Sequence, residues 1–406
     1  MKRRLACLAL LASALMAQHA GAQRARVITI GEVNSYSGAA GFAEHAEHYR
    51  NGWQLAVEQV NNAGGINGHL LAVISRDDGG VQEQAEQLAQ GLITQDKVDV
   101  LAGTYRSNIG LAVSAVAARN KKIFIAAEPL SDAITWDKGN RYTFRLRPST
   151  YMQAAMLVEA AAKLPARRWA MLAPNYEYGQ SAVASFKVLL KAKRPDVEFI
   201  GEEWPALGKI DAAKSVQALA QAKPDAIFNA TFGPDLVKFV REAKRRGLFI
   251  NTPVVSMLGG EPETLAMLKE ETPKGWIVTG YPWEQIDTPE HNKFVAAYQK
   301  KFNDYPRVGS LVGYSVIIAI AEGIKKAEST DSEKLITAMR DLHFATPIGP
   351  AMFRAIDQQS TMGAYVGTLD VKAGKGVMSN WHYADGSSYL PGEAYVRTRR
   401  PASAMK

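Results

Sequence analysis

Cysteine is almost absent from this chain of 406 residues, which contains only Cys7. No disulfide can form within the chain, so a large hydrophobic core must hold the folded state together. Hydrophobic residues make up 47% of the sequence and charged residues 22%, which is typical of a globular protein with such a core. The length predicts about two domains of ordinary size.

Long apolar runs are also missing, except for a short one near the start. Three basic residues precede the uncharged run at 5–17, and Ala-Gly-Ala follows it at 20–22. This order predicts a signal peptide over residues 1–22, with cleavage between Ala22 and Gln23. No later stretch reaches the roughly 20 uncharged apolar residues that a membrane helix needs. We therefore expect a soluble, exported protein, and the lack of disulfides and anchors fits the periplasm best.

Cys7 itself has two interpretations. A lipid-attachment cysteine should follow the apolar run, whereas Cys7 precedes most of it. Removal with the signal peptide is therefore the favoured interpretation, and it leaves the mature chain without cysteine.

Charge of one sign is in only modest excess. The net charge is +8, and loss of the signal peptide with its three basic residues leaves +5. The basic residues in "KFVREAKRR" at 238–246 recur at helical spacing, which is more typical of a solvated helix face than of a nucleic-acid groove. We expect no nucleic-acid partner.

Motifs of catalysis are absent as well. The chain has no G-x-S-x-G turn, no H-E-x-x-H helix, no P-loop lysine and no G-x-G-x-x-G after a strand. We expect a protein that is not an enzyme and has no cofactor. His45 and His48 share a helix face and would form a metal site with Glu44, but an exposed helix start explains them more simply. We expect no metal.

Short β-branched runs alternate with amphipathic stretches from Gln23 onward, and this alternation predicts an α/β fold. In the first half we expect strands at 26–33, 70–76, 98–103 and 122–126 and helices at 45–62, 82–94 and 108–119. In the second half we expect strands at 169–173, 197–202, 226–231, 254–257 and 276–280 and helices at 151–163, 179–193, 212–222, 234–246 and 262–270. Helices then dominate 289–342, and "MGAYVGTLDV" is a last β-like segment.

The segment "VEQVNNAGGINGHLLAVISRDDGG" at 57–80 raises the question of a phosphate loop. A phosphate loop places its glycines between a strand and the following helix. Here the order is helix, glycines, strand, so the glycines predict a helix stop and a turn. Asp77 and Asp78 point to opposite faces of a strand, and capping of the next turn or helix explains them better than an acid–base pair does.

The segments "GEVNSYSGAAG", "NNAGGINGHLLAV" followed by "DD", "VDVLAGTYRSN", "APNYEYGQS" and "GYPW" occur in this order along the chain. Together they resemble the periplasmic solute-binding proteins of the branched-chain amino acid (Leu/Ile/Val) ABC-transporter family. The resemblance covers essentially the whole mature chain. It implies a type I periplasmic binding protein fold, with two doubly wound Rossmann-like lobes joined by three hinge crossings. We place the crossings near 146–150, 280–284 and 348–354, with 23–147 plus 284–350 in the first lobe and 148–283 plus 351–406 in the second.

In the first lobe, ligand contacts are expected beyond the carboxyl ends of the strands. Ser107 lies in the turn "GTYRSN" before a helix, where its hydroxyl and the free N–H groups suit a carboxylate, although it would also serve as a helix cap. The resemblance implies the same role for Ser107. Beside it, Arg106 either contacts the ligand or points to solvent. The resemblance places Glu128 and Leu130 where family members hold the ligand ammonium; Glu128 would neutralise an amine, pair with Arg106 or lie exposed.

In the second lobe, the resemblance places aromatic side chains against the ligand side chain. Tyr178 and Phe232 match these positions, and Tyr281 and Trp283 would form the opposite wall. Met257 or Leu258 stands where amino-acid binders often carry an acidic residue, and Glu261 lies beyond the expected reach. The resemblance further places Phe42 and His45 near the mouth of the cleft.

The resemblance implies a monomeric receptor that closes around a small carboxylate ligand and delivers it to an inner-membrane ABC permease. A branched-chain or other hydrophobic amino acid is the first expectation, and an aromatic or aliphatic acid or an amide is the alternative. A ligand sensor with the same fold is a further alternative. A periplasmic hydrolase that uses Ser107 is less favoured, because no activated nucleophile lies beside a base in the sequence.

Overall fold

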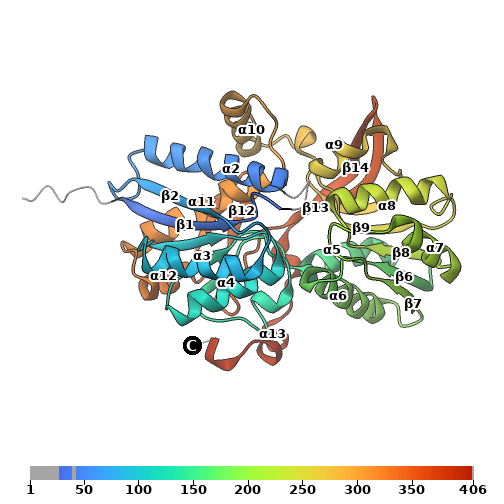
Figure 1. Ribbon diagram of the computed structural model, residues 1–406, viewed down its shortest axis with the longest axis horizontal. Helices are drawn as coiled ribbons and strands as arrows, with labels where there is room; N and C mark the ends of the chain where they lie inside the picture. The colour runs from blue at the N-terminus through green and yellow to red at the C-terminus, as the bar shows by residue number, and fades with distance from the viewer. Residues whose placement is uncertain (1–26, 39–42, 405–406) are drawn as a thin grey trace, which may run out of the picture.

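The computed structural model describes residues 27–38 and 43–404 and has two α/β lobes side by side (Figure 1). The predicted signal peptide, its cleavage site, Cys7 and Phe42 lie outside the described residues. The first lobe is blue to teal with orange helices in Figure 1, and the second is green to yellow with red strands. This is the α/β arrangement that the sequence predicts.

The sheet of the first lobe has five parallel strands in the order β2-β1-β3-β4-β5. Its strands are β1 (Ile28–Asn34), β2 (Leu71–Asp77), β3 (Val100–Gly103), β4 (Phe124–Ala126) and β5 (Thr143–Arg145). Its helices are α2 (Ala43–Asn62), α3 (Gln82–Thr94), α4 (Ser107–Arg119), α10 (Pro289–Phe302), α11 (Val308–Ala327) and α12 (Ser332–Met339). Four strands and three helices of the first half are confirmed to within three residues, and β5 is new.

The sheet of the second lobe has seven strands in the order β14-β13-β10-β9-β8-β6-β7. Its strands are β6 (Arg168–Leu172), β7 (Glu198–Glu203), β8 (Ala226–Asn229), β9 (Val254–Gly260), β10 (Ile277–Gly280), β13 (Ala364–Lys372) and β14 (Lys375–Ala384). Its helices are α5 (Thr150–Ala161), α6 (Glu177–Lys193), α7 (Ala212–Ala222), α8 (Gly233–Arg245) and α9 (Pro262–Leu268). β13 pairs in antiparallel orientation with both β10 and β14, and all other strand pairs in this sheet are parallel.

The glycine-rich stretch after α2 is a turn, as predicted. Gly64 and Gly65 have φ of 96° and 75°, a backbone conformation that glycine adopts without strain. At the end of β2, Asp77 Oδ1 accepts the amide of Gly79 at 2.9 Å, and Asp78 Oδ1 accepts that of Gly80 at 2.7 Å. The two aspartates therefore cap a turn and do not form an acid–base pair.

Helix α11 is the one helix among the described residues that is long and apolar enough to cross a membrane. It is a core helix here, because 78% of its most apolar window is buried and the helix packs along α2. Glycines allow the close approach: a Cβ at Gly52 would lie 2.0 Å from the carbonyl oxygen of Ser310, and one at Gly313 would lie 2.1 Å from that of Tyr49.

Three hinge crossings join the lobes, and the chain returns to the first lobe once more after β14. The first crossing joins β5 to α5 and the second joins β10 to α10, near the predicted positions. The third lies further along the chain than predicted, because β11 (His343–Thr346) and β12 (Gly349–Met352) form an antiparallel hairpin there. Residues 358–360 then pair with β5, and the chain passes to β13 only after Ser360. Residues 351–360, which the sequence analysis assigns to the second lobe, therefore lie with the first.

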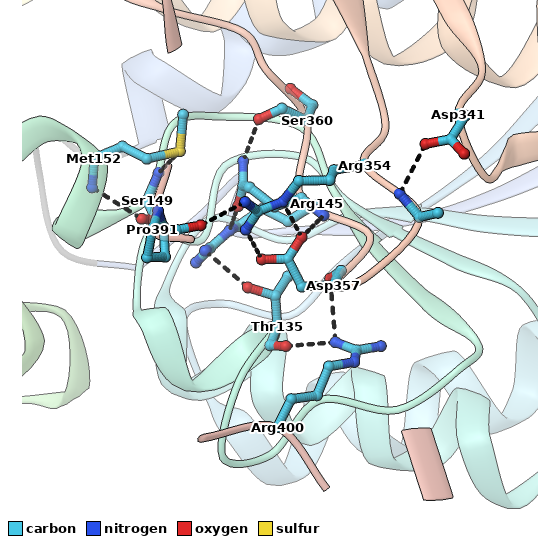
Figure 2. Close-up of polar contacts among 12 residues, drawn as sticks. Thr135, Arg145, Ser149, Met152, Asp341, Arg354, Asp357, Ser360, Pro391 and Arg400 are labelled. Carbon is cyan, nitrogen blue, oxygen red and sulfur yellow. Dashed lines mark hydrogen bonds and ion pairs between the residues drawn. The ribbon is translucent and has the colours of Figure 1, made fainter. Parts of the chain in front are cut away.

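The C-terminal segment also lies against the first lobe, below it in Figure 1. After α13 (Glu393–Arg399), the guanidinium of Arg400 donates to the carbonyl oxygens of Thr135 and Asp357 (Figure 2). Arg354 forms an ion pair with Asp357 in the same region and donates to the carbonyl oxygen of Pro391 at 2.7 Å. Arg400, which is buried, and Arg354, which is half-buried, thus join the C-terminal segment to the segment that pairs with β5.

Candidate functional site

A narrow, partly open pocket lies between the lobes, where the carboxyl ends of both sheets face each other. Turns that follow β3 and β4, the first crossing, and the starts of α6, α8 and α9 all contribute side chains to it. The lining residues are Tyr105, Ser107, Glu128, Leu130, Arg147, Tyr176, Tyr178, Phe232, Leu258 and Glu261. Five of the eleven residues predicted from the sequence are among them: Ser107, Glu128, Leu130, Tyr178 and Phe232.

Ser107 is the first residue of α4 and is buried. Its Oγ accepts hydrogen bonds from the amides of Leu130 and Ser131, both at 3.2 Å. These two donors occupy the oxygen, so the hydroxyl proton is the group that remains for a ligand. The free N–H groups of the first turn of α4 lie beside it and favour an anion. A hydroxyl group held in this way can donate its proton to a carboxylate, but its oxygen is not an activated nucleophile.

Arg145, which the sequence analysis does not single out, fixes the loop that holds Ser107. Its side chain is fully buried, and its guanidinium donates to the carbonyl oxygen of Leu130 at 3.0 Å and to that of Ser131. It also donates to Thr135 Oγ1 at 3.1 Å. Burial lowers the pKa of Arg145 to about 10, so it is a cation at neutral pH.

Glu128 pairs with His45, not with Arg106. His45 Nε2 lies 2.8 and 2.9 Å from the two carboxylate oxygens of Glu128, and Nδ1 lies 3.3 Å from Glu263 Oε1. Burial alone would lower the pKa of His45, but the two carboxylates outweigh burial and raise it well above its ordinary value. For Glu263 the effect of burial has the opposite sign and would raise its pKa, but the hydrogen bond from His45 holds that pKa at about 2.

Glu261, which the sequence analysis places beyond reach of the ligand, lines the pocket. It forms an ion pair with Arg147 of the first crossing at 2.8 Å, and both side chains are 9% exposed. Burial raises the pKa of Glu261 although Arg147 opposes it, and the pKa of Arg147 is raised because Glu261 and Glu128 outweigh its own burial. The pairing of β9 with β10 has a register irregularity between Ser256 and Gly260, directly before Glu261, which a sequence pattern does not reveal.

Aromatic rings form the apolar wall of the pocket. The rings of Tyr178 and Phe232 meet edge to face at 5.6 Å, and Tyr105 meets Phe232 in the same way at 6.3 Å. The ring of Tyr176 lies 6.0 Å from that of Tyr178, and the ring of Tyr105 also packs against that of His45 at 4.6 Å in a tilted arrangement. Three rings come from the second lobe and one from the first, so the wall spans both lobes.

Four predicted site residues lie outside this pocket. Arg106 donates to the carbonyl oxygen of Gly80 at 2.9 Å, and Met257 is fully buried in the core of the second lobe. The Tyr281 hydroxyl hydrogen-bonds His291 Nε2 at 2.7 Å, and Trp283 stacks on Tyr305 at 4.8 Å. Tyr281 and Trp283 sit on the second crossing, and they line another hollow at its outer side.

The two histidines of α2 are buried, in contrast to the expected exposed helix start. His45 borders the pocket through Glu128, as described above. His48 lies 3.7 Å from Glu44, and no group of three or more metal-ligating side chains is found in the part of the chain that the structure describes.

Comparisons with known proteins agree with this architecture. A family model described as "Periplasmic binding protein" matches residues 27–375. The chain is 26% identical over 346 residues to Leu/Ile/Val-binding protein homolog 7 of Brucella suis biovar 1, and the match covers 81% of this chain and 85% of that protein.

Two solved structures are also similar. One is a branched-chain amino acid transporter of the ABC type from Rhodopseudomonas palustris CGA009, with a TM-score of 0.73, 26% identity, and coverage of 89% of this chain and 97% of that one. The other is a solute-binding protein of an ABC transporter from Rhodopseudomonas palustris BisB5 in complex with 3,4-dihydroxybenzoic acid. It has a TM-score of 0.78, 24% identity, and coverage of 89% and 98%.

Proposed function

The chain belongs to the periplasmic binding protein family, as a solute-binding protein of an ABC transporter, and we propose that its ligand is an amino acid with a hydrophobic side chain. Membership of the family implies a periplasmic location. Export would use the signal peptide at 1–22, and the mature monomer would deliver its ligand to an inner-membrane permease. The family consists of receptors and not enzymes, and the two amides that hold Ser107 Oγ argue against a hydrolase.

The carboxylate end of the ligand would lie at the start of α4. There the Ser107 hydroxyl has its proton available, and the first-turn amides carry a partial positive charge. Arg145 holds the neighbouring carbonyl groups of Leu130 and Ser131 turned away from this point, so the donors are in place before the ligand arrives.

The balance of charge is the observation that carries the proposal of an amino acid. Glu128, Glu261 and Glu263 bring three carboxylates into or beside the pocket, whereas His45 and Arg147 bring two cations. An ammonium group would compensate the remaining negative charge, and a buried charge without a partner is costly. A zwitterion therefore fits both ends of the pocket.

The hydrophobic side chain of the ligand would pack against Tyr105, Tyr178 and Phe232, with Leu130 and Leu258 beside them. Aromatic faces from both lobes would close on it, and contacts with both lobes would favour the closed state over the open one. This is the proposed basis of transport: the closed, loaded form is presented to the permease.

An aromatic acid without an amine is the second candidate, and one observation favours it. Glu128 of the first lobe and Glu261 of the second already have cationic partners at 2.8 Å, so neither carboxylate of the pocket is left unpaired to offer an ammonium. The four aromatic rings would suit a flat ligand. The similar protein in complex with 3,4-dihydroxybenzoic acid has a ligand of this kind.

Isothermal titration calorimetry would decide between these ligands. The chain from Gln23 is unfolded and refolded to remove bound ligand, then titrated with leucine, isoleucine, valine and phenylalanine. The matched acids without an amine are 4-methylpentanoate and 3-phenylpropanoate, with benzoate and 4-hydroxybenzoate as aromatic acids. We expect micromolar or tighter binding of at least one amino acid and binding at least 100-fold weaker for its matched acid.

Two variants assign the ends of the ligand. Ser107→Ala should weaken binding by about 10- to 100-fold, because a hydrogen bond to a charged group contributes about 1.5–3 kcal/mol. Glu128→Gln should weaken binding of the amino acid more than binding of the matched acid that lacks an amine. Tight binding of the acids alone would contradict the proposed amino-acid ligand and favour the second candidate.

A further inference from the structure

His45 makes contacts to both lobes at once. It lies on α2 of the first lobe, and its Nε2 is 2.8 Å from Glu128, which follows β4 of the same lobe. Its Nδ1 is 3.3 Å from Glu263, in the first turn of α9 of the second lobe. The side chain of His45 is 6% exposed, that of Glu128 is 0% exposed and that of Glu263 is 13% exposed, so solvent screens these ion pairs little.

The geometry requires a particular protonation state. A neutral imidazole donates from one ring nitrogen only, whereas an imidazolium donates from both. Since each ring nitrogen of His45 faces a carboxylate, only the charged ring satisfies Glu128 and Glu263 together. The amide of Gly309 at the start of α11 lies 3.4 Å from the same oxygen of Glu263, which adds a weaker contact between the lobes.

We propose that His45 is a positioning residue that holds the lobes closed over the ligand, through simultaneous ion pairs to Glu128 of the first lobe and Glu263 of the second. We call these three residues the interlobe clasp. The clasp rests on the proposed function, because it explains how closure around a ligand is stabilised. It predicts that closure and ligand affinity both depend on the His45 proton.

The other groups that face His45 leave it as the one cation of the clasp. From its own helix, His48 has a lowered pKa owing to burial and to Arg307 of α11, so His48 is neutral near pH 7. From the β3–α4 turn, Tyr105 packs against the ring and burial keeps it protonated. From the start of α9, Glu261 adds a further carboxylate, which is paired with Arg147.

The direction of the pH dependence follows from these contacts. When the lobes open, His45 keeps Glu128 of its own lobe but loses Glu263, so its pKa is lower in the open state than in the closed state, where both carboxylates raise it. The clasp is therefore complete below the open-state pKa of His45 and is lost as the pH rises through its closed-state pKa. Loss of one proton changes the ratio of closed to open forms by up to about tenfold per pH unit in that interval.

The test uses the ligand-free mature chain, so that it does not depend on the identity of the ligand. Spin labels on Gln87→Cys in the first lobe and Gln221→Cys in the second, both at exposed positions of a mature chain without cysteine, report the distance between the lobes. We expect a short distance at pH 6 and a growing population of long distances toward pH 9. With His45→Gln, the long distances should be present at pH 6 and should not change with pH.

Two further variants keep the result interpretable. Glu263→Gln removes the partner in the second lobe without altering α2, and it should also open the lobes at pH 6. His382→Gln removes an exposed histidine of β14 and should behave as the unmodified chain. A closed population that does not change with pH in the unmodified chain, or that is unchanged in both His45→Gln and Glu263→Gln, would overturn the proposal.

Calorimetry with L-leucine and 3-phenylpropanoate separates this proposal from the proposed function. If either compound binds, its affinity should fall as the pH rises from 6 toward 9 in the unmodified chain, and the fall should be absent in His45→Gln. If neither binds while the distances respond to pH as described, the ligand assignment fails and the interlobe clasp stands. A bound ligand whose affinity falls equally in both chains would count against the clasp alone.

Discussion

A buried carboxyl group in the first sheet illustrates how one residue can set the pH dependence of stability. Glu32 on β1 is 2% exposed and accepts hydrogen bonds from Tyr36 at 3.0 Å and from Ser75 at 2.5 Å. Burial raises its pKa to about 7 in spite of these donors. The folded protein thus keeps a proton on Glu32 at a pH at which the unfolded chain has released it.

We predict that the free energy of unfolding falls as the pH rises from about 4.5 to 7, and that Glu32→Gln removes this part of the fall. The folded pKa is raised, so the stabilisation is present at low pH and is lost as the pH passes through the folded value. The contribution of Glu32 to the fall in the free energy of unfolding is at most about 3 kcal/mol, since each unit of difference between its folded and unfolded pKa corresponds to about 1.36 kcal/mol. Urea unfolding of both chains at pH 5 and pH 8 measures it.

Glu198→Gln on β7 is the matched control, because Glu198 is exposed. In this control, the free energy of unfolding should differ between pH 5 and pH 8 by the same amount as in the unmodified chain. Equal pH dependence in Glu32→Gln and the unmodified chain would show that Glu32 is ionised in the folded state.

At the scale of the residue, the sequence indicates which positions lie at strand ends but not which charges meet. Ser107, Glu128 and Tyr178 follow or precede recognisable elements, so topology and family resemblance together place them at the pocket. The partners of the charges come from distant parts of the chain: His45 is 83 residues from Glu128. Nothing in a local pattern records such a pair, which is why Arg106 was considered as the partner of Glu128 and His45 was expected at an exposed helix start.

At the scale of the element, the contact between α2 and α11 depends on glycine. A Cβ at Gly52 would lie 2.0 Å from a carbonyl oxygen of α11, and backbone cannot give way as a flexible side chain does. We predict that Gly52→Ala lowers the free energy of unfolding by about 1–3 kcal/mol or more, although alanine is the better helix former. Denaturant unfolding monitored by circular dichroism measures the change.

Gly91→Ala in α3 provides the opposite case. The nearest atom to a Cβ there is Gln95 Oε1 at 3.9 Å, so alanine fits. The free energy of unfolding of this variant should be higher by about 0.5–1 kcal/mol, which is the usual difference between glycine and alanine inside a helix. Equal effects of the two substitutions would mean that helix propensity, and not the packing of α2 on α11, decides both.

The elements that could not be predicted from the sequence are those whose hydrophobic pattern is too short or whose residues are too exposed. β5 has three residues, and no period can be recognised in a run of that length. β14 is a mostly half-exposed edge strand of mixed polarity, and only its antiparallel pairing with β13 makes it a strand. The β11–β12 hairpin has the same character, and for that reason the third crossing was expected too early.

At the scale of the whole molecule, the C-terminal segment joins the two lobes at the side opposite to α10 in Figure 1. Tyr395 of α13 packs on Trp136 of the first lobe at 5.5 Å and on Tyr151 of α5 in the second at 5.9 Å. Arg399 holds this position through an ion pair with Asp137 at 2.7 Å. The segment therefore supports the arrangement of the lobes in addition to the three crossings.

We predict that Tyr395→Ala lowers the free energy of unfolding by about 1–3 kcal/mol, because it removes two aromatic contacts that each contribute about 0.5–1.5 kcal/mol beyond the buried area. Arg397→Ala is the control: its exposed ion pair with Glu393 contributes about 0–1 kcal/mol. Urea unfolding of the three chains compares them. The same experiment bears on how the lobes are held together, because Tyr395 contacts a residue of each lobe. If Tyr395→Ala were as stable as Arg397→Ala, α13 would only rest on the first lobe, and the three crossings alone would set how the lobes meet.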